Sequence, residues 1–269
     1  MGKAVTALGR TTRSAPSIAT GIPHGNWTEQ MNDIPPSRRI AVIGRGRLGS
    51  VLAPALHAEP ALARGEPIEP GTEVVILAVP DAALAPLAAE LAPGPVVGHC
   101  SGALSLDVLA PHRERFSLHP LMTLTAESQP RQLIGAGAAI AGSSPRALAI
   151  AGELAQCAGL EPFRLAEEDR ALYHAAASIA SNFLVALEAI ADRLFNSVGV
   201  EHRHAAALAR ASLENWATLG AQRALTGPIA RGDSATVARQ RAALAARAPD
   251  LLGLFDALAA ATASLGAPA

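Results

Sequence analysis

Residues 42–49 read Val-Ile-Gly-Arg-Gly-Arg-Leu-Gly, a glycine-rich turn between a short apolar run and a run with helical spacing. In this pattern the first glycine allows a tight turn, the second lets a pyrophosphate approach the backbone, and the third lets the helix pack closely. A helix that begins at such a turn also presents N–H groups to phosphate. The alternative is a glycine turn without a ligand. The context favours a dinucleotide site formed by Gly44, Arg45, Gly46, Arg47, Leu48 and Gly49.

Short apolar runs alternate with helical runs around this turn, throughout residues 39–166. The alternation is typical of an α/β domain with a Rossmann-type, doubly wound parallel sheet. The helix that follows the second of these strands is expected to be capped by Asp81. Strands are predicted at residues 39–43, 73–79, 95–99, 115–118, 136–141 and 162–165, and helices at residues 48–57, 81–91 and 145–158.

The strand pattern stops at about residue 167, and helices are predicted at residues 167–198, 201–224, 234–247 and 249–264. We therefore expect an all-helical second domain over residues 167–269 that provides substrate and dimerisation surfaces. Residues 1–38 are rich in Gly, Ser, Thr and Pro and predict a flexible N-terminal extension. Met31 leaves open that the upstream residues come from a start site placed too early.

Composition narrows the class of protein. Half of the 269 residues are hydrophobic, so a large core can be buried. The formal net charge of -1 gives no electrostatic footprint for nucleic acid or an anionic membrane. The two cysteines, Cys100 and Cys157, have no spacing typical of a disulfide framework or a metal site. Without a secretory signal or an uninterrupted apolar run of ~20 residues, a soluble cytoplasmic protein acting on a small molecule is expected.

Cofactor choice depends on the segment after the first helix. No convincing acidic residue stands about 20 positions after the turn, where NAD-binding domains hold the ribose hydroxyls. Arg64 lies 20 residues after Gly44, where a cation would meet the 2′-phosphate of NADP, and Arg45 and Arg47 could assist. Alternatively, the arginines are solvated and Glu59 or Glu66 turns inward. We expect NADP, with NAD as the alternative.

Polar residues follow several predicted strands, at the edge where open α/β sheets bind ligands. Val79 and Pro80 end one strand, and His99 ends the next, so all three are candidates for contact with the cofactor. Ser101 follows as a candidate for substrate binding, although it could instead cap a helix near Ala103 while His99 is a satisfied core residue. His119 ends a further strand and suits proton transfer near neutral pH, but a turn histidine without a role is the alternative.

A polar stripe distinguishes the second domain. His174, Ser178 and Asn182 recur every four residues on a predicted helix of small apolar residues. Because buried polar groups need partners, the stripe indicates a pocket or a ligand, with helix–helix hydrogen bonds as the alternative. Tyr173 lies beside the stripe and is expected to pack rather than to donate a proton. The only lysine is Lys3, so no mechanism can use a lysine of the folded core.

Taken together, these segments resemble a family of bacterial proteins that pair a Rossmann-like domain with a C-terminal helical domain of unknown function. The family is related to the superfamily of pyrroline-5-carboxylate reductases, deazaflavin-dependent NADP oxidoreductases and β-hydroxyacid dehydrogenases. The resemblance spans about residues 39–265. It rests on the glycine turn and on residues 77–81, 99–103, 116–121, 173–177, 181–182 and 225–228.

The resemblance implies a 6-phosphogluconate-dehydrogenase-like helical domain, hydride transfer between NADP(H) and a small carbonyl, hydroxy-acid or imine substrate, and a homodimer. Many relatives use a helix with a catalytic lysine and a substrate-binding asparagine four residues later. Asn182 matches the asparagine, whereas the lysine position falls on Ser178. His174 is therefore the nearest candidate proton donor, with His99 and His119 as rivals. The missing lysine keeps open a second hypothesis, a regulatory or scaffold protein that binds NAD(P) without catalysis; a deazaflavin partner is a third.

Overall fold

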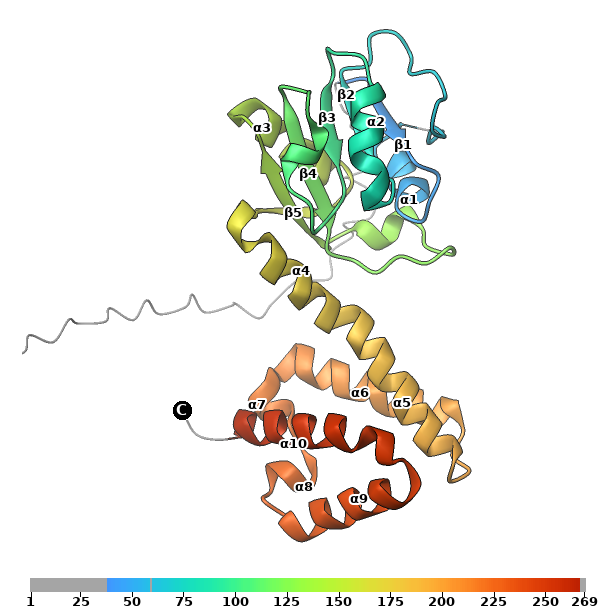
Figure 1. The fold of residues 1–269 in the computed structure, drawn as a ribbon, viewed down its shortest axis with the longest axis vertical. Helices are drawn as coiled ribbons and strands as arrows, with labels where there is room; N and C mark the ends of the chain where they lie inside the picture. The colour runs from blue at the N-terminus through green and yellow to red at the C-terminus, as the bar shows by residue number, and fades with distance from the viewer. Residues whose placement is uncertain (1–37, 59, 267–269) are drawn as a thin grey trace, which may run out of the picture. The chain divides into compact units, whose positions relative to one another are not determined.

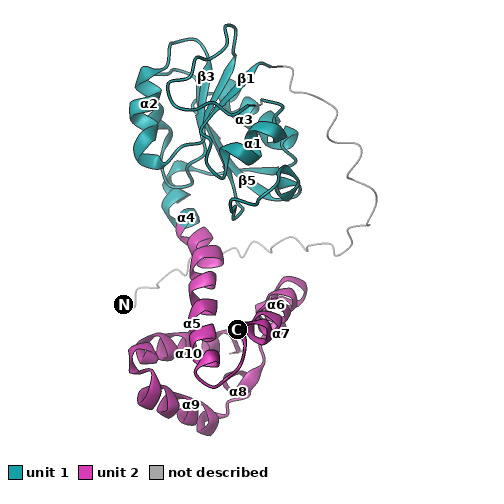
Figure 2. Ribbon diagram, turned by 90° about the vertical axis from the view of Figure 1, so that its right-hand side faces the viewer, with its two compact units in different colours: residues 1–174 teal, residues 175–269 magenta. Residues whose placement is uncertain are grey.

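The computed structural model describes residues 38–58 and 60–266. Most of the predicted N-terminal extension, together with Glu59 and Lys3, lies outside these residues. The chain forms two compact units, which divide between His174 and Ala175 (Figure 2). The division falls inside a long helical stretch rather than at residue 166, where the strand pattern ends.

The first unit is built on a six-stranded sheet (Figure 1). Every predicted strand is present. The first three are apolar runs buried on both faces of the sheet, whereas the last, Glu161–Arg164, is largely exposed. The strand order β1-β2-β3-β4-β5-β6 follows the sequence, and β1 to β4 are parallel to one another. The strands are β1 Ile40–Ile43, β2 Val74–Leu77, β3 Val96–His99, β4 Arg115–Pro120, β5 Gly137–Gly142 and β6 Glu161–Arg164.

One strand departs from the expected parallel sheet. β5 runs antiparallel to β4, and β6 is parallel to β5. The connection between β4 and β5 holds only the short 3₁₀ helix Pro130–Leu133. A parallel pair needs a longer crossover, so this connection suits an antiparallel return. The carboxyl ends of β1 to β3 meet at one edge of the sheet, where Ile43, Leu77 and His99 pair in register, and Ser117 of β4 pairs with His99. Open α/β sheets bind their ligands at such an edge.

Helices cover both faces of the sheet, as in a doubly wound fold. One face packs against α1 (Gly49–Ala55) and α3 (Pro145–Cys157), through side chains that include Leu52 and Leu154. The other face packs against α2 (Leu84–Glu90) and the 3₁₀ helix Leu106–Leu109. Each fully buried leucine contributes about 1.5–3 kcal/mol through removal of apolar surface from water. Asp81 does not cap a helix as predicted, because it is the first residue of the 3₁₀ turn Asp81–Ala83 and Pro80 takes the capping position.

The segment after α1 is much shorter than in a full Rossmann unit. Leu62 forms a single parallel bridge with Ile43, and residues 63–73 include no helix or strand. The backbone of Leu62 bonds to Val42 and Gly44 on either side of that bridge. The segment thus ends close to the glycine loop, which we define as residues 44–49.

The second unit is helical (Figure 1). The predicted helix over residues 201–224 is divided by Gly220, whose φ of 77° a helix cannot accommodate. The stretch Gly227–Ala230, which lies outside the predicted helices, forms a short helix. The helices are α4 Arg170–Ser178, which begins in the first unit, α5 Leu184–Asn196, α6 His202–Leu219, α7 Ala221–Ala224, α8 Gly227–Ala230, α9 Ser234–Arg247 and α10 Leu252–Gly266.

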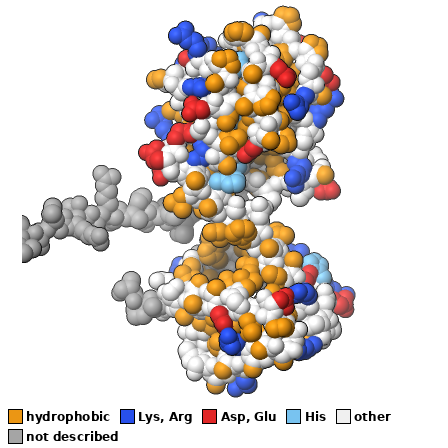
Figure 3. All heavy atoms as spheres, viewed as in Figure 1, with side chains coloured by type: hydrophobic (Ala, Val, Ile, Leu, Met, Phe, Trp, Pro, Cys, Tyr) orange, Lys and Arg blue, Asp and Glu red, His pale blue; other side chains and the backbone are white. Residues whose placement is uncertain are grey.

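Apolar side chains lie exposed on these helices. The helical stretch Glu167–Asn196 is long and apolar enough, by length and composition, to cross a membrane, and its most apolar window has no buried residue. The core helix of a soluble protein passes the same test. Hydrophobic side chains also gather on the surface of the helical unit in Figure 3. The large exposed ones include Ile179, Phe183, Val185, Leu208, Leu213 and Trp216.

Candidate functional site

The glycine loop has the backbone geometry that its pattern predicts. Gly44 has a φ of 127°, and a Cβ built there would lie 2.2 Å from the carbonyl oxygen of Ala78. A Cβ at Gly49 would lie 1.7 Å from the carbonyl oxygen of Gly44. Both positions therefore require glycine for the turn itself, whether or not a ligand binds.

Gly46 differs from its two neighbours in the motif. A Cβ built there would meet no atom within 4 Å. The backbone N–H groups of residues 45–48 also make no hydrogen bond with other described residues. Open space above a glycine, beside N–H donors without intramolecular acceptors, fits a pyrophosphate. This is the observation by which the loop fits a dinucleotide.

The three candidate arginines, Arg45, Arg47 and Arg64, differ in their contacts. Arg45 is held in place, because its guanidinium donates to both carboxylate oxygens of Glu66 at 2.8 Å and to the carbonyl oxygen of Ala61 at 3.0 Å. Glu66 also accepts the N–H of Ala63 at 2.9 Å. Arg47 and Arg64 are exposed. Glu66 thus turns toward the loop, one of the alternatives that the sequence left open.

Residues that follow β2 connect the loop with the rest of the sheet edge. Val79 packs close to the loop, since its Cγ1 would lie 3.3 Å from a Cβ at Gly44. Pro80 and Asp81 follow directly. The charge of Asp81 acts on His119, at the end of β4. The candidate cofactor residues and the candidate proton-transfer residue therefore belong to one edge of the first unit.

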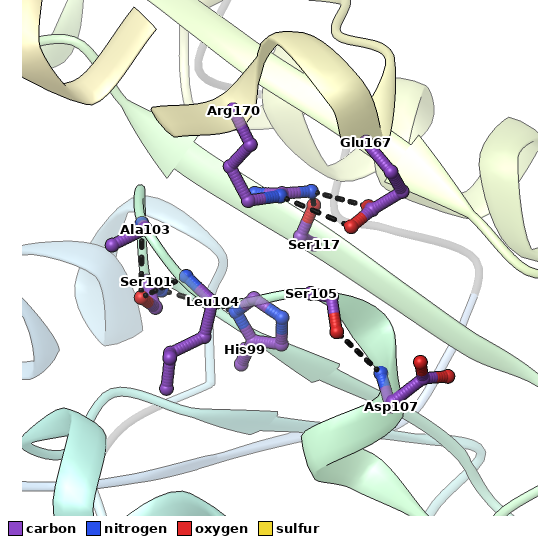
Figure 4. A network of polar contacts seen from close by, with 9 residues as sticks. All are labelled: His99, Ser101, Ala103, Leu104, Ser105, Asp107, Ser117, Glu167 and Arg170. Carbon is purple, nitrogen blue, oxygen red and sulfur yellow. Dashed lines mark hydrogen bonds and ion pairs between the residues drawn. The ribbon is translucent and has the colours of Figure 1, made fainter. Parts of the chain in front are cut away.

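His99 and Ser101 form a compact turn after β3 (Figure 4). The N–H of Ser101 donates to Nδ1 of His99 at 3.1 Å, and the Ser101 hydroxyl accepts the N–H groups of Ala103 and Leu104. No helix begins near Ala103; a 3₁₀ helix begins at Leu106, capped by Ser105. The hydroxyl therefore stabilises a turn instead of capping a helix.

The His99 ring is fully buried, and it supports the Ser101 turn from within the core. Burial lowers the pKa of His99 to about 4, and the positive charge of Arg170 acts in the same direction. The ring is consequently neutral at pH 7. Nδ1 accepts a hydrogen bond, so the proton resides on Nε2. The backbone of Ser105 opposes the lowering of the pKa of His99.

Arg170 is a buried cation that the sequence reasoning missed. Its side chain is 3% exposed, at the start of α4 (Figure 4). It donates to Glu167 at 2.8 Å and to the Ser117 hydroxyl of β4 at 3.1 Å. A buried charge is stable only when it is paired and hydrogen-bonded, and Glu167 and Ser117 meet that need. The (i, i+3) spacing of Glu167 and Arg170 was the available signal, but it is equally typical of a solvated helix surface.

Two histidines, His119 and His174, meet beside Gly102, and Tyr173 contacts the first of them. Nδ1 of His119 lies 2.7 Å from the Tyr173 hydroxyl, and the two rings meet edge to face. The His174 ring lies 6.5 Å from that of His119, centroid to centroid. A Cβ at Gly102 would lie 2.8 Å from Nε2 of His119 and 3.0 Å from Cδ2 of His174. The small residue thus lets both histidines approach the turn after β3.

Burial lowers the pKa of His119 to about 4, assisted by His174 and Arg170 and opposed by Asp81. Burial raises the pKa of Tyr173, while Arg170 opposes that shift. At neutral pH the imidazole of His119 therefore has one N–H and one lone pair, and the phenol is protonated. The expectation that Tyr173 only packs was too simple, because its hydroxyl bonds to a candidate proton-transfer residue.

Ser178 and Asn182 belong to the second unit. Ser178 ends α4, and Asn182 lies in a π-helical turn, Ile179–Phe183, which interrupts the expected regular helix. The hydroxyl of Ser181 donates to the carbonyl oxygen of Ala177 at 2.8 Å inside this segment. π turns are rare and frequent at functional sites. The stripe is therefore divided: His174 belongs to the first unit and its other two members to the second.

Comparisons with known proteins agree on the fold. Residues 137–262 match a family described as a domain of unknown function (DUF2520). A search of curated proteins finds no match. Solved structures that resemble the chain include a "putative NADP oxidoreductase" from Bacteroides fragilis, with a TM-score of 0.72, 18% identity and coverage of 84% of this chain and 98% of the other.

Two further structures have the same fold. A Thermotoga maritima protein matches with a TM-score of 0.72 and 24% identity, and 1-pyrroline-5-carboxylate reductase from Streptococcus pyogenes matches with 0.56 and 15%. Each comparison covers 84% of this chain and 98% of the other. The expected combination of a Rossmann-type sheet with a C-terminal helical domain is confirmed. At these identities the likeness concerns the fold.

Proposed function

We propose that this protein is an oxidoreductase that transfers a hydride between NADP(H) and a small carbonyl, hydroxy-acid or imine compound. The observation that carries the proposal is the open space above Gly46, beside N–H donors that have no intramolecular acceptors. The names of two structural neighbours, an NADP oxidoreductase and a reductase of 1-pyrroline-5-carboxylate, support it. Fold alone would not, because one fold serves many functions.

In this proposal the glycine loop holds the pyrophosphate, and Val79 and Pro80 border the cofactor along the sheet edge. Bound nicotinamide supplies or accepts the hydride. Ser101 lies at the turn where the substrate would meet that edge, and His174 and His119 provide for proton transfer. His99 keeps the Ser101 turn in place from the core. Ser178 and Asn182 belong to the second unit, and their predicted role in substrate binding stays a prediction.

We propose NADP rather than NAD as the preferred cofactor. Arg64 is exposed near the loop, and Arg45 neutralises the Glu66 carboxylate, which would otherwise repel a 2′-phosphate. Dissociation constants of NADPH and NADH, measured by titration, test the preference. Tighter binding of NADH would overturn it and would assign Glu66 to the ribose hydroxyls instead.

For the assembly we propose a cytoplasmic homodimer formed through the helical unit. The exposed apolar side chains of α5 and α6, among them Val185 and Trp216, support an interface, since monomers rarely expose large contiguous apolar patches. Sedimentation equilibrium should give twice the mass of one chain. A monomer, or a protein that stays soluble only in detergent, would contradict this assembly.

A second candidate function is that of a regulatory or scaffold protein that binds NAD(P) without turnover. The feature in its favour is Ser178, which stands where the resemblance implies a catalytic lysine, in a chain whose only lysine is Lys3. The experiment that separates the two candidates has two parts. One is a spectrophotometric screen for NADPH oxidation with keto acids, aldehydes and cyclic imines; the other is a thermal shift with NADP(H). Turnover supports the oxidoreductase, and stabilisation without turnover on any compound supports the second candidate.

A further inference from the structure

Tyr173 is the only tyrosine of the chain, and its hydroxyl lies 2.7 Å from Nδ1 of His119. Its ring is held from two sides, edge to face, by His119 at 5.6 Å and by Phe163 at 6.0 Å between centroids. Tyr173 as a whole is half-buried, and its hydroxyl is positioned by the contact with His119. A packing residue alone would not require this hydroxyl.

The other nitrogen of His119 faces a different direction. Nε2 points to the space above Gly102, which the exposed His174 ring also borders. The three side chains therefore form a series: exposed His174 lies next to His119, and His119 contacts the hydroxyl of Tyr173. A neutral imidazole in this position can take a proton at one nitrogen while it releases one from the other.

The surroundings of His119 and Tyr173 favour the neutral form of both side chains. Arg170 and His174 act on His119 against protonation, Asp81 acts in its favour, and burial makes the largest contribution, against it. Burial raises the pKa of the Tyr173 phenol, and the charge of Arg170 lowers it by a smaller amount. A neutral imidazole next to a protonated phenol exchanges protons without creating a lasting buried charge, which would be costly in this environment.

We propose that Tyr173 is the proton donor of the reaction and that His119 reprotonates it, an inference that rests on the proposed reductase function. As the hydride forms the new C–H bond, the π electron pair of the substrate C=O or C=N bond takes the phenolic proton. The Nδ1 proton of His119 passes to the phenolate oxygen, and Nε2 takes a proton from the His174 side. In the reverse direction every transfer reverses.

The hydrogen bond is tested without cofactor or substrate. 3-Fluorotyrosine incorporation gives a single ¹⁹F resonance, because Tyr173 is the only tyrosine. We expect the resonance to move in His119→Asn, and to titrate with His119 in the wild-type protein. His204→Asn, at an exposed histidine of α6, should leave it unchanged. A resonance insensitive to His119→Asn would overturn the inference.

Catalysis is tested with Tyr173→Phe, which retains the ring and its packing. We expect kcat to fall by about hundredfold or more, the usual contribution of a positioned acid, while the NADPH dissociation constant changes less than twofold. His119→Asn should reduce kcat and shift the pH profile. Unchanged kcat in Tyr173→Phe would overturn the proton donor alone. Wild-type protein that neither binds NADPH nor turns over any substrate would overturn the proposed function, and this inference with it.

Discussion

The Glu66 carboxylate holds the Arg45 guanidinium through two hydrogen bonds of 2.8 Å, across the edge of the glycine loop. This pair brings a carboxylate to the region where NAD-binding domains hold the ribose and, in the same contact, cancels its charge. We therefore expect the preference between NADP and NAD to depend on the net charge that Arg45, Glu66 and Arg64 present to the cofactor.

Arg64→Ala should weaken NADPH binding about tenfold, the equivalent of one exposed charge-assisted contact of about 1.4 kcal/mol, and leave NADH binding unchanged. Isothermal titration with both nucleotides measures the effect. Arg146→Ala, an exposed arginine of α3, is the matched control. An equal loss for both nucleotides would show that Arg64 does not contact a 2′-phosphate.

Glu66→Gln should move the preference further toward NADPH, because it removes a negative charge while the amide can still bond to Arg45. The ratio of the NADH and NADPH dissociation constants should rise about threefold to tenfold. The nucleotide titrations measure this ratio directly. A fall in the ratio would assign Glu66 to the ribose of NAD.

Gly46→Val separates ligand binding from folding. A Cβ at this position would meet no atom within 4 Å, so we expect the melting temperature to change little while nucleotide binding is lost. Gly49→Val is the matched control, because a Cβ there would lie 1.7 Å from the carbonyl oxygen of Gly44 and should destabilise the fold by several kcal/mol. Normal NADPH binding by Gly46→Val would contradict the placement of the pyrophosphate.

The buried His99 makes stability depend on pH. Its pKa falls from 6.5 to about 4 on folding, so between these values the unfolded chain binds more protons than the folded one. The contribution of His99 is therefore neutral above pH 6.5 and becomes unfavourable as the pH falls toward 4, by up to about 3 kcal/mol.

Denaturant unfolding at several pH values measures this loss, and His99→Gln should lose less stability than the wild type between pH 6.5 and 4. His204→Gln, at an exposed histidine, is the control and should behave as the wild type does. Parallel pH curves for His99→Gln and the wild type would show that His99 is not the group responsible.

Strands and the glycine turn were predictable because they depend on local patterns. Runs such as Val74–Leu77 are apolar on both faces and bounded by turn residues, and Gly44, Gly46 and Gly49 have their standard spacing. The direction of β5 was not predictable in the same way. Its sequence, Gly137–Gly142, fits a buried strand of either direction, and only the lack of a crossover helix selects the antiparallel one.

The contacts of His119 with Tyr173 and of Arg170 with Ser117 were harder to predict from the sequence. His119 was recognised as a candidate, but its contact with Tyr173 joins β4 to α4, far apart in the chain, and no periodicity relates them. Arg170 was missed because an arginine near Glu167 is most often solvated; burial of its side chain depends on packing against Ser117 of β4. The π turn at Ile179–Phe183 likewise leaves no pattern in residue types.

The central claim is that the glycine loop binds a nicotinamide dinucleotide for hydride transfer. Isothermal titration of the full chain with NADPH tests the binding step most directly. We expect saturable binding of about one NADPH per chain, with a dissociation constant in the range of about 1 μM to 1 mM, and no binding in Gly46→Val. No saturable binding by the folded wild-type protein, or equal binding by Gly46→Val, would contradict it.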